Sequence, residues 1–380
     1  MQLTAIHRIY AHTGLQSFVE ASGGLFVVGF LVKQGLSPAL ALASFALVLI
    51  SRFALRAAVL PIAHAHGLRA VLLLGCGVRA ASFLMLPFVE GTGLLLLAYI
   101  LVSGLGSVLY WTGYHAYVSA AGDNAALGRQ VSIQQATTAA VGIVAPVAGG
   151  FLLSGAGPVI GFAVIAAMQL LAGLPLAGAP NPAIPRESRA DPAIVSAGRR
   201  IYFAEGLQSG CSVVVWNLAL FVTLGQSFES FGGALALAGL GAAAGSLIIG
   251  RLIDGGRGTH SLALAYGLGA AVLVLKALAW TSPLPALVAT ALGALAAPML
   301  ATAMLSPLYA MAQRSQCTLR FNMATEGGWD LGCSTAALVA AALLATGFGY
   351  TMPILLGLLA IAGIAWGLTQ WYRAEQALTA

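Results

Sequence analysis

The chain of 380 residues has very little charge: Asp, Glu, Lys and Arg together make up 7% of it. Soluble globular domains carry about 25% charged residues, so this composition excludes an ordinary soluble domain. Hydrophobic residues make up 59% of the chain, and its mean hydropathy is +0.93. We therefore expect a protein that faces lipid. The net charge of +6 does not indicate a nucleic-acid partner, because the basic residues are divided among short loops rather than gathered on one face.

Cysteine is also scarce, and the motifs of common enzymes are absent. The four cysteines form no C-x-x-C pair: Cys76, Cys211, Cys317 and Cys333. They are expected to be buried, inert thiols. The sequence contains no H-E-x-x-H, Walker A or G-x-S-x-G motif. We therefore expect neither an enzyme nor a resident cofactor or metal, and we interpret His64 and His66 as part of a solvated loop.

The sequence contains an internal repeat. Residues 8–17 read RIYAHTGLQS and residues 200–209 read RIYFAEGLQS, with seven of the ten positions identical at an offset of 192 residues. This offset is half of the chain, so the sequence predicts two copies of one unit in the same order. In membrane transporters, duplicated halves of this kind place a substrate site between them.

Twelve apolar stretches of about 20 residues each are long enough to cross a bilayer as helices. They are 9–31, 38–60, 69–88, 92–119, 129–153, 157–178, 200–224, 230–252, 260–281, 284–312, 322–345 and 350–372. The sequence predicts an all-α membrane protein with twelve transmembrane helices in two six-helix bundles, residues 1–178 and 200–380, joined by a polar linker at 179–199. The first stretch contains Glu20 and no A-x-A-like cleavage site, so we expect it to be retained rather than cleaved. Gly239 and Gly241 in the eighth stretch are interpreted as close helix packing rather than a nucleotide loop.

The positions of the basic residues predict the orientation of the chain. If the N-terminus is cytoplasmic, twelve arginines lie at cytoplasmic ends: Arg8, Arg69, Arg129, Arg186, Arg189, Arg199, Arg200, Arg251, Arg257, Arg314, Arg320 and Arg373. Lys33 and Lys276 lie toward the other side. This asymmetry follows the positive-inside rule, so we expect both termini in the cytoplasm. We expect a monomer in a cell inner membrane.

Two local patterns, together with twelve predicted helices in two parallel repeats, resemble the major facilitator superfamily. The first pattern, from Gly250 through Asp254 to Arg257, resembles the G-x-L-x-D-x-x-x-R loop of that superfamily. The corresponding first-half loop, residues 60–69, lacks the acidic residue. The second pattern, Gly142-x-x-x-Ala145-Pro146-x-x-Gly149-Gly150, is similar to the G-x-x-x-G-P-x-x-G-G motif of the superfamily's drug–proton antiporters. The alternative for this pattern is ordinary small-residue packing between membrane helices.

Polar residues inside the predicted spans indicate the site, because charge inside a bilayer is costly. His12, Gln16 and Glu20 share one helix face, as do Glu205, Gln208 and Ser212 in the second half. The resemblance implies that spans 1, 4, 7 and 10 line a central cavity, with Gln16 and Gln208 on opposite sides. The side chains expected to contact substrate are His12, Gln16, Trp111, Tyr114, His115, Gln208, Trp216 and Asn217. The alternative is that the aromatic residues are ordinary packing or a headgroup belt.

From these observations we expect a secondary active transporter that moves a small organic or amphiphilic solute by alternating access. Proton coupling is favoured because buried carboxylates can change protonation state, and we assign it to Glu20 first and to Glu205 second. For Glu20 a purely structural role is the alternative. Export is favoured by the antiporter-like pattern alone. Two further alternatives remain open: a metal or metal-chelate carrier using His12, Glu20, His115 and Cys211, and a membrane receptor or scaffold without transport.

A cytoplasmic gate is predicted from four charged residues. Arg52 and Arg56 share one face of span 2, and Glu326 and Asp330 share one face of span 11. The resemblance implies that these spans meet, and their antiparallel course pairs Arg56 with Glu326 and Arg52 with Asp330, about 6 and about 12 Å from the cytoplasmic ends. Asp254 is assigned to the same gate. The alternative is that the arginines extend to the membrane surface and the acids serve substrate or protons. Arg79 and Lys276 remain without a role.

Overall fold

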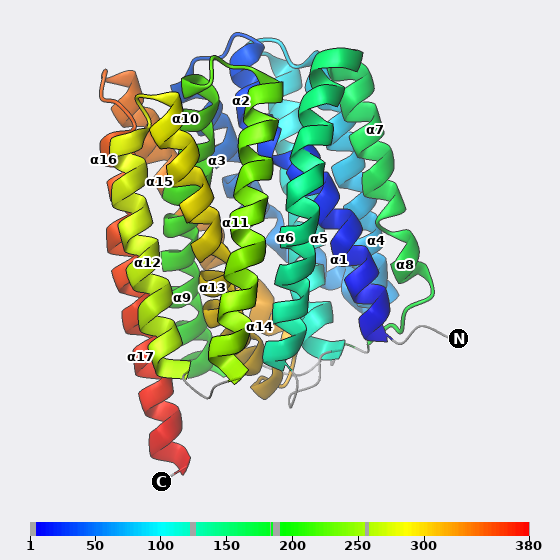
Figure 1. Cartoon of the computed structure of the whole chain (residues 1–380). Helices are drawn as coiled ribbons and strands as arrows, with labels where there is room; N and C mark the ends of the chain where they lie inside the picture. Colours follow the sequence, from blue (N-terminus) through cyan, green and yellow to red (C-terminus); the bar gives the residue numbers. More distant parts are fainter. Residues whose placement is uncertain (1–4, 122–126, 183, 185–190, 255–257, 380) are drawn as a thin grey trace.

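The computed structural model describes the whole chain except residues 1–4, 122–126, 183, 185–190, 255–257 and 380 (Figure 1). Within these described ranges the regular structure is entirely helical. Side-chain caps are found at the helix starts at Pro38 and Pro192. The Ser37 hydroxyl accepts a hydrogen bond from the Leu40 amide, and the Asp191 carboxylate accepts one from Ala193, each directly before a proline that opens the helix.

The first half contains eight α-helices: α1 Ala5–Ser22, α2 Val27–Lys33, α3 Pro38–Leu55, α4 Val59–Met85, α5 Leu94–Ala121, α6 Leu127–Phe151, α7 Gly157–Leu171 and α8 Leu174–Ala177. Short connecting turns of other helix types are η1 Gly24–Phe26, η2 Arg56–Ala58, η3 Leu86–Phe88 and the π-helical η5 Leu152–Ala156.

The second half contains nine α-helices: α9 Pro192–Ser209, α10 Trp216–Thr223, α11 Phe228–Asp254, α12 Gly258–Ala279, α13 Pro283–Arg314, α14 Thr318–Thr325, α15 Gly327–Ala345, α16 Thr351–Leu355 and α17 Gly357–Thr379. The π-helical turn η6 Gly210–Val215 lies between α9 and α10. Because α9 begins at Pro192, the last part of the linker predicted at 179–199 is helical.

Among the described residues, eight helical segments are long and apolar enough to cross a membrane. Two of them, 38–88 and 129–177, each contain two predicted spans, which are separated by glycines with positive φ at Gly67 and Gly157. Two shorter apolar helices, 228–244 and 263–279, overlap two further predicted spans. The structure is therefore that of a multi-pass helical membrane protein. Twelve crossings and the division into two six-helix bundles remain predictions.

The helices run roughly parallel to one another, and α1 begins at the same end of the array at which α17 finishes (Figure 1). We call this the terminal end and the other the opposite end. The two halves touch most extensively where α6 packs on α11 and α13, α3 on α15 and α5 on α14. The α6–α11 contact is made at backbone distance, since a Cβ added at Gly239 would lie 2.6 Å from the Gly142 carbonyl oxygen. A Cβ at Gly241 would lie 2.4 Å from the Ala291 carbonyl oxygen. The close packing predicted for these glycines is confirmed.

The turn between the second and third predicted spans is built around Gly67. The helical conformation continues to His66, breaks at Gly67 with φ 82°, and resumes, so the loop predicted for His64 and His66 is helical instead. Asn181 braces this break: its amide donates to the His66 carbonyl over 3.1 Å, and its Oδ1 accepts from the Arg69 amide over 3.1 Å.

Replacing Gly67 with Ala should destabilise the protein by about 1–3 kcal/mol through backbone strain alone, and further through the clash with Asn181. An added Cβ would lie 2.2 Å from the Asn181 Nδ2 atom. The control is Gly91→Ala, because Gly91 also has a positive φ, of 60°, but no atom within 4 Å of the added Cβ. Thermal unfolding of the detergent-solubilised variants measures both effects. Equal losses in the two variants would show that Asn181 does not restrict this turn.

Candidate functional site

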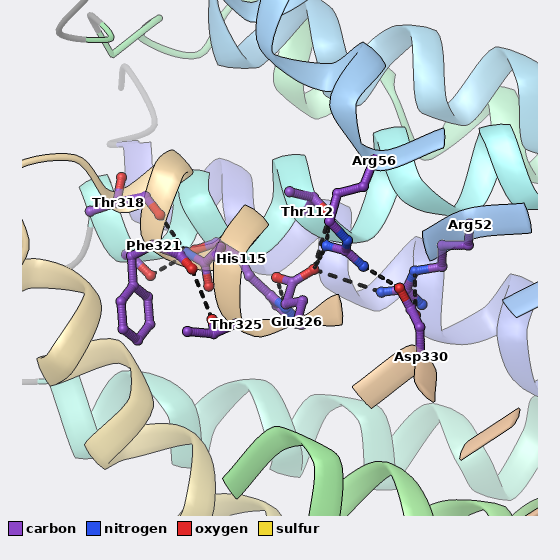
Figure 2. A network of polar contacts seen from close by, with 11 residues as sticks. Arg52, Arg56, Thr112, His115, Thr318, Phe321, Thr325, Glu326 and Asp330 are labelled. Carbon is purple, nitrogen blue, oxygen red and sulfur yellow. Dashed lines mark hydrogen bonds and ion pairs between the residues drawn. The ribbon is translucent and has the colours of Figure 1, made fainter. Parts of the chain in front are cut away.

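A cluster of buried polar side chains joins the two halves, and we call it the interdomain charge cluster. It contains Arg52, Arg56, Thr112, His115, Glu326 and Asp330 (Figure 2). The arginines come from the end of α3 and the start of η2, and Thr112 and His115 come from α5. Glu326 lies directly before α15, and Asp330 lies in its first turn.

The four charged side chains contact one another in both the predicted and the crossed combinations. Arg52 Nε lies 3.0 Å from Asp330 Oδ1, and Arg56 Nη1 lies 3.2 Å from Glu326 Oε2, which are the two predicted pairs. Arg56 Nη2 also contacts Asp330, and Arg52 Nη2 lies 3.7 Å from Glu326 Oε2. Arg52 Nε and Asp330 Oδ1 are close enough for an ion pair but not aligned as a hydrogen bond. The predicted ladder is therefore a compact group of four charges.

Two residues of α5 complete the coordination of Glu326. Thr112 Oγ1 donates to Glu326 Oε2 over 3.0 Å and accepts from Arg56 Nη1 over 2.8 Å. His115 Nδ1 lies 2.8 Å from the other carboxylate oxygen, Glu326 Oε1. The Glu326 and Asp330 side chains are at most 1% exposed, so pairing and hydrogen bonding are what offset the large cost of removing these charges from water. His115, predicted to contact substrate, belongs to this cluster.

The cluster lies deeper in the helix array than predicted. The segment that starts at Pro38 remains helical to His66, so Arg52 lies near its middle. The partner segment starts at Thr318 rather than 322, which places Asp330 about 18 Å along it instead of about 12 Å. Gly327 allows the close approach, because an added Cβ there would meet the Phe53 ring at 2.9 Å. The side chain of Asp254, also assigned to the gate, lies outside the described side chains.

A second polar group lies within the first half and gives Arg79 a partner. Arg79 donates to Glu20, and its Nε donates to Gln169 Oε1 over 3.3 Å. Gln169 Nε2 donates to Gln16 Oε1 over 2.8 Å, and Gln16 Nε2 donates to Glu20 Oε1 over 2.9 Å. The four side chains form a closed ring from α1, α4 and α7. Glu20, expected to be a lone carboxylate, is therefore paired with a cation.

Histidine and aromatic side chains of the first half stack beside this ring. His12 is 0% exposed; its Nδ1 lies 2.6 Å from the Ala172 carbonyl oxygen and its Nε2 lies 2.9 Å from the Tyr110 hydroxyl. Since a carbonyl oxygen only accepts, Nδ1 carries the proton and Nε2 accepts from Tyr110 in the neutral ring. Tyr114 bonds Thr13 over 2.9 Å. Trp111, half-buried, packs edge-on against both tyrosines.

The predicted residues of the second half are not brought together with those of the first. Gln208 Nε2 donates to Ser212 Oγ over 2.9 Å, while Gln16 bonds within its own half, so no contact joins the two glutamines. Trp216 Nε1 donates to Thr290 over 3.1 Å. Asn217 is half-buried on the same segment. Of the side chains proposed as metal ligands, His12, Glu20 and His115 each bond a different partner and Cys211 is a buried free thiol. Among the described residues no three potential ligands gather into a metal site.

Glu205 lies beside the interdomain charge cluster without belonging to it. Ser209 Oγ donates to Glu205 Oε1 over 2.7 Å, and the Trp329 side chain lies near the same carboxylate. The Trp329 ring also faces the Arg52 guanidinium at 5.4 Å. Trp329 therefore lies between Glu205 and Arg52. Sequence reasoning missed Trp329, Thr112 and Gln169; the only sequence signal was that each is polar or amphipathic within an apolar stretch.

The halves also touch near the opposite end, through aromatic rings. Phe26 packs edge-on against Phe231 at 5.3 Å, and Phe30 stacks with Phe228 at 6.4 Å. Phe221 lies against Gly29, where an added Cβ would meet its ring at 3.0 Å. These rings come from η1 and α2 on one side and from α10 and α11 on the other. The two halves are therefore in contact through charges in the middle of the array and through apolar rings near one end.

Comparisons with known proteins identify the fold. No protein-family model matches the sequence, and no curated protein matches it significantly. Among solved structures, the chain is similar to the human organic anion transporter MFSD10 (TETRAN), with a TM-score of 0.69 and 16% identity over 96% of this chain and 98% of that one. It is also similar to a bacterial homologue of the iron transporter ferroportin in the outward-facing state, with a TM-score of 0.67 and 14% identity over 98% and 100%. A third match is FucP, a major facilitator superfamily transporter in the outward conformation, with a TM-score of 0.66 and 12% identity over 96% and 97%. The chain therefore has the fold of the major facilitator superfamily, as the sequence resemblance implied.

Proposed function

We propose that the protein is a secondary active transporter that moves a small organic solute across a membrane by alternating access. The observation that carries this proposal is the interdomain charge cluster, which joins α3 and α5 of one half to α15 of the other. Such a contact can hold one side of a transporter closed and be released when that side opens. The phenylalanine contacts near the opposite end can hold the other side closed in the same way.

The chemistry of the interdomain charge cluster and of the phenylalanine contacts suits an alternate opening of the two ends. Separating Arg52 and Arg56 from Glu326 and Asp330 in a dry interior would leave uncompensated charges, at a cost of about 3–5 kcal/mol for each broken pair. Opening of the terminal end admits water, which can solvate the same charges. The phenylalanine layer behaves in the opposite way, because exposing it to water is unfavourable. Charge pairing thus stabilises the closed state at the cluster, and the hydrophobic effect stabilises it at the phenylalanine rings.

We place the coupling proton at Glu205 rather than at Glu20. Glu20 has a fixed cation, Arg79, whereas no cation lies within 4.0 Å of Glu205 among the described residues. Trp329 connects Glu205 to the cluster, since its side chain lies near the carboxylate and its ring faces the Arg52 guanidinium. Protonation of Glu205 would remove a negative charge near Arg52 and so change the electrostatic energy of the charge cluster. Export follows from the antiporter-like pattern in α6, Gly142 to Gly150.

The cargo is proposed to be an organic solute rather than a metal ion. The half-buried residues that remain as candidate contacts are Trp111, Gln208 and Asn217. One matched structure is named an organic anion transporter and another a homologue of an iron transporter. The first name fits this chain better, because the four side chains considered as metal ligands do not gather into one site. We further propose a monomer in a cell inner membrane, with cytoplasmic termini.

Alternating access can be tested without knowing the substrate. Spin labels at Ala65 and Gln316 report the terminal end, and labels at Thr92 and Thr281 report the opposite end; all four residues are exposed. Each pair has one residue in each half. Between pH 5.5 and 8.5 the two distance distributions, measured by pulsed electron paramagnetic resonance, should change in opposite directions. The unmutated chain is the labelling control because its four cysteines are buried. Distributions that stay fixed at both ends would contradict the proposal.

A further inference from the structure

A buried lysine in the second half has no carboxylate partner. Lys276 on α12 is 8% exposed, and its Nζ donates to the Ser212 carbonyl oxygen over 2.8 Å. The ammonium group also makes a cation–π contact with the Trp216 ring, whose centroid lies 5.2 Å away. Within the part of the chain that the structure describes, no Asp or Glu oxygen lies within 4.0 Å of this ammonium group. Lys276 is therefore a buried amine with no carboxylate beside it to neutralise its protonated form.

The internal repeat shows what is missing there. The offset of 192 residues places Gln208 on Gln16 and Ser212 on Glu20. The hydrogen bond from Gln16 to Glu20 and the one from Gln208 to Ser212 both measure 2.9 Å. The two halves therefore share this side-chain hydrogen bond as well as the repeated sequence.

In the first half a cation from the third predicted span, Arg79, contacts Glu20 at this corner. In the second half a cation from the corresponding ninth predicted span, Lys276, contacts residue 212. Serine stands there in place of glutamate. The second half has kept the cation and the glutamine but lacks the anion.

The groups that now contact Lys276 replace this anion only in part. Ser212 lies in the π-helical turn η6, where altered hydrogen bonding frees backbone carbonyl groups, and one of these accepts from Lys276. Trp216 occupies the position equivalent to Gly24, where an added Cβ would lie 2.4 Å from Glu20 Oε2. Trp216 thus takes the space that Gly24 leaves for a carboxylate. A carbonyl dipole and an aromatic face attract an ammonium group, but neither carries a formal negative charge.

Gly293 of α13 lies against the amine of Lys276, since a Cβ added there would be 3.0 Å from Nζ. A protonated lysine has three donors, and only one has an acceptor among the described residues. Two donors therefore remain available.

We propose that Lys276, Ser212 and Trp216 form a subsite for an anionic group, with Lys276 as the charge that selects it. This inference rests on the proposed transport function, because it assigns to the cargo, or to an ion carried with it, a carboxylate or a small inorganic anion. The bound anion takes the electrostatic place that Glu20 holds in the first half.

The probe pair that tests this subsite is sodium benzoate and neutral benzamide, which differ in charge but little in shape. Thermal unfolding of the purified full chain is followed at constant ionic strength, with sodium chloride as a separate arm. Benzoate should raise the unfolding temperature in a saturable manner, and benzamide should act at least tenfold more weakly. A chloride effect that competes with benzoate would identify the site as one for inorganic anions as well.

Three variants make the test specific to Lys276. Lys276→Gln should weaken benzoate binding at least tenfold, and Lys276→Arg, which keeps the charge, should retain it within a few-fold. Lys33→Gln is the matched control, since Lys33 also contacts one carbonyl oxygen, of Gln226, and one aromatic ring, of Phe228, but is exposed. It should bind benzoate as the unmutated chain does.

The proposal is overturned if benzoate and benzamide act equally, if neither benzoate nor chloride stabilises the chain, or if Lys276→Gln binds benzoate normally. Failure of transport gives a different result. In that case the spin-label distances would stay fixed while benzoate still bound in a Lys276-dependent manner.

Discussion

An Arg52→Asp variant should populate a conformation that is open at the terminal end, with the Ala65–Gln316 distance lengthened. The substitution removes one cation from the interdomain charge cluster and places a third carboxylate beside Asp330, which is 0% exposed. Breaking a buried pair of this kind costs about 3–5 kcal/mol. Since about 1.4 kcal/mol changes an equilibrium tenfold, the closed population should fall by more than about a hundredfold. Pulsed distance measurements on the labelled variant provide the readout.

The double variant Arg52→Asp with Asp330→Arg should recover most of the closed population, because it restores two positive and two negative charges. The matched control is Arg69→Asp. Arg69 also lies toward the terminal end, but its side chain contacts carbonyl groups of its own half, at Ala177 and Ala179. It should leave the Ala65–Gln316 distance unchanged. If Arg52→Asp keeps the distribution of the unmutated chain, the cluster does not hold the terminal end closed.

The second large effect is expected at Glu205. Glu205→Gln resembles the protonated side chain and cannot release a proton, so it should abolish the response of both label pairs to pH between 5.5 and 8.5. The remaining distribution should match that of the unmutated chain at low pH. The reason is the connection through Trp329, which lies near the carboxylate and faces Arg52. A full pH response in this variant would exclude Glu205 as the coupling group.

Two further substitutions separate coupling from structure. Glu229→Gln changes an exposed carboxylate at the start of α11 and should preserve the pH response. Glu20→Gln should lower the unfolding temperature, because it leaves Arg79 without its carboxylate, yet should also preserve the pH response. If Glu20→Gln abolishes the response and Glu205→Gln does not, the coupling proton belongs at Glu20, as the sequence first indicated.

The two charged faces of the cluster were predictable because their spacing is local, and the resemblance to the major facilitator superfamily implied that they meet. Arg52 with Arg56, and Glu326 with Asp330, are each spaced four residues apart, and helix geometry converts that spacing into two matching faces. Its depth was not predictable, since the helix continues past the apolar stretch to His66 and the turn depends on Asn181, a residue more than 100 positions away. The periodicity of the sequence contains no information about a contact of this kind between distant residues.

The Glu20–Arg79 pair shows the other limit. Each residue is a single charge in an apolar stretch, and nothing in the spacing of 59 residues links them. Only the packing of α1 and α7 with α4, which brings Gln16 and Gln169 between them, closes the ring. Composition can identify a buried charge that requires a partner. It cannot choose among the partners that tertiary packing supplies.

The seam between α6 and α11 has a mechanical consequence. Pro146 has no amide hydrogen, so the carbonyl group of Gly142, four residues earlier, lacks its usual helical donor. That oxygen faces Gly239, and the Pro146 carbonyl oxygen in turn lies 2.4 Å from a Cβ added at Gly232. Backbone thus rests on backbone, without side chains that would have to disengage. Under the proposed alternating-access mechanism, this α6–α11 contact can serve as the pivot between the two halves. The interdomain charge cluster and the phenylalanine contacts would then separate in turn.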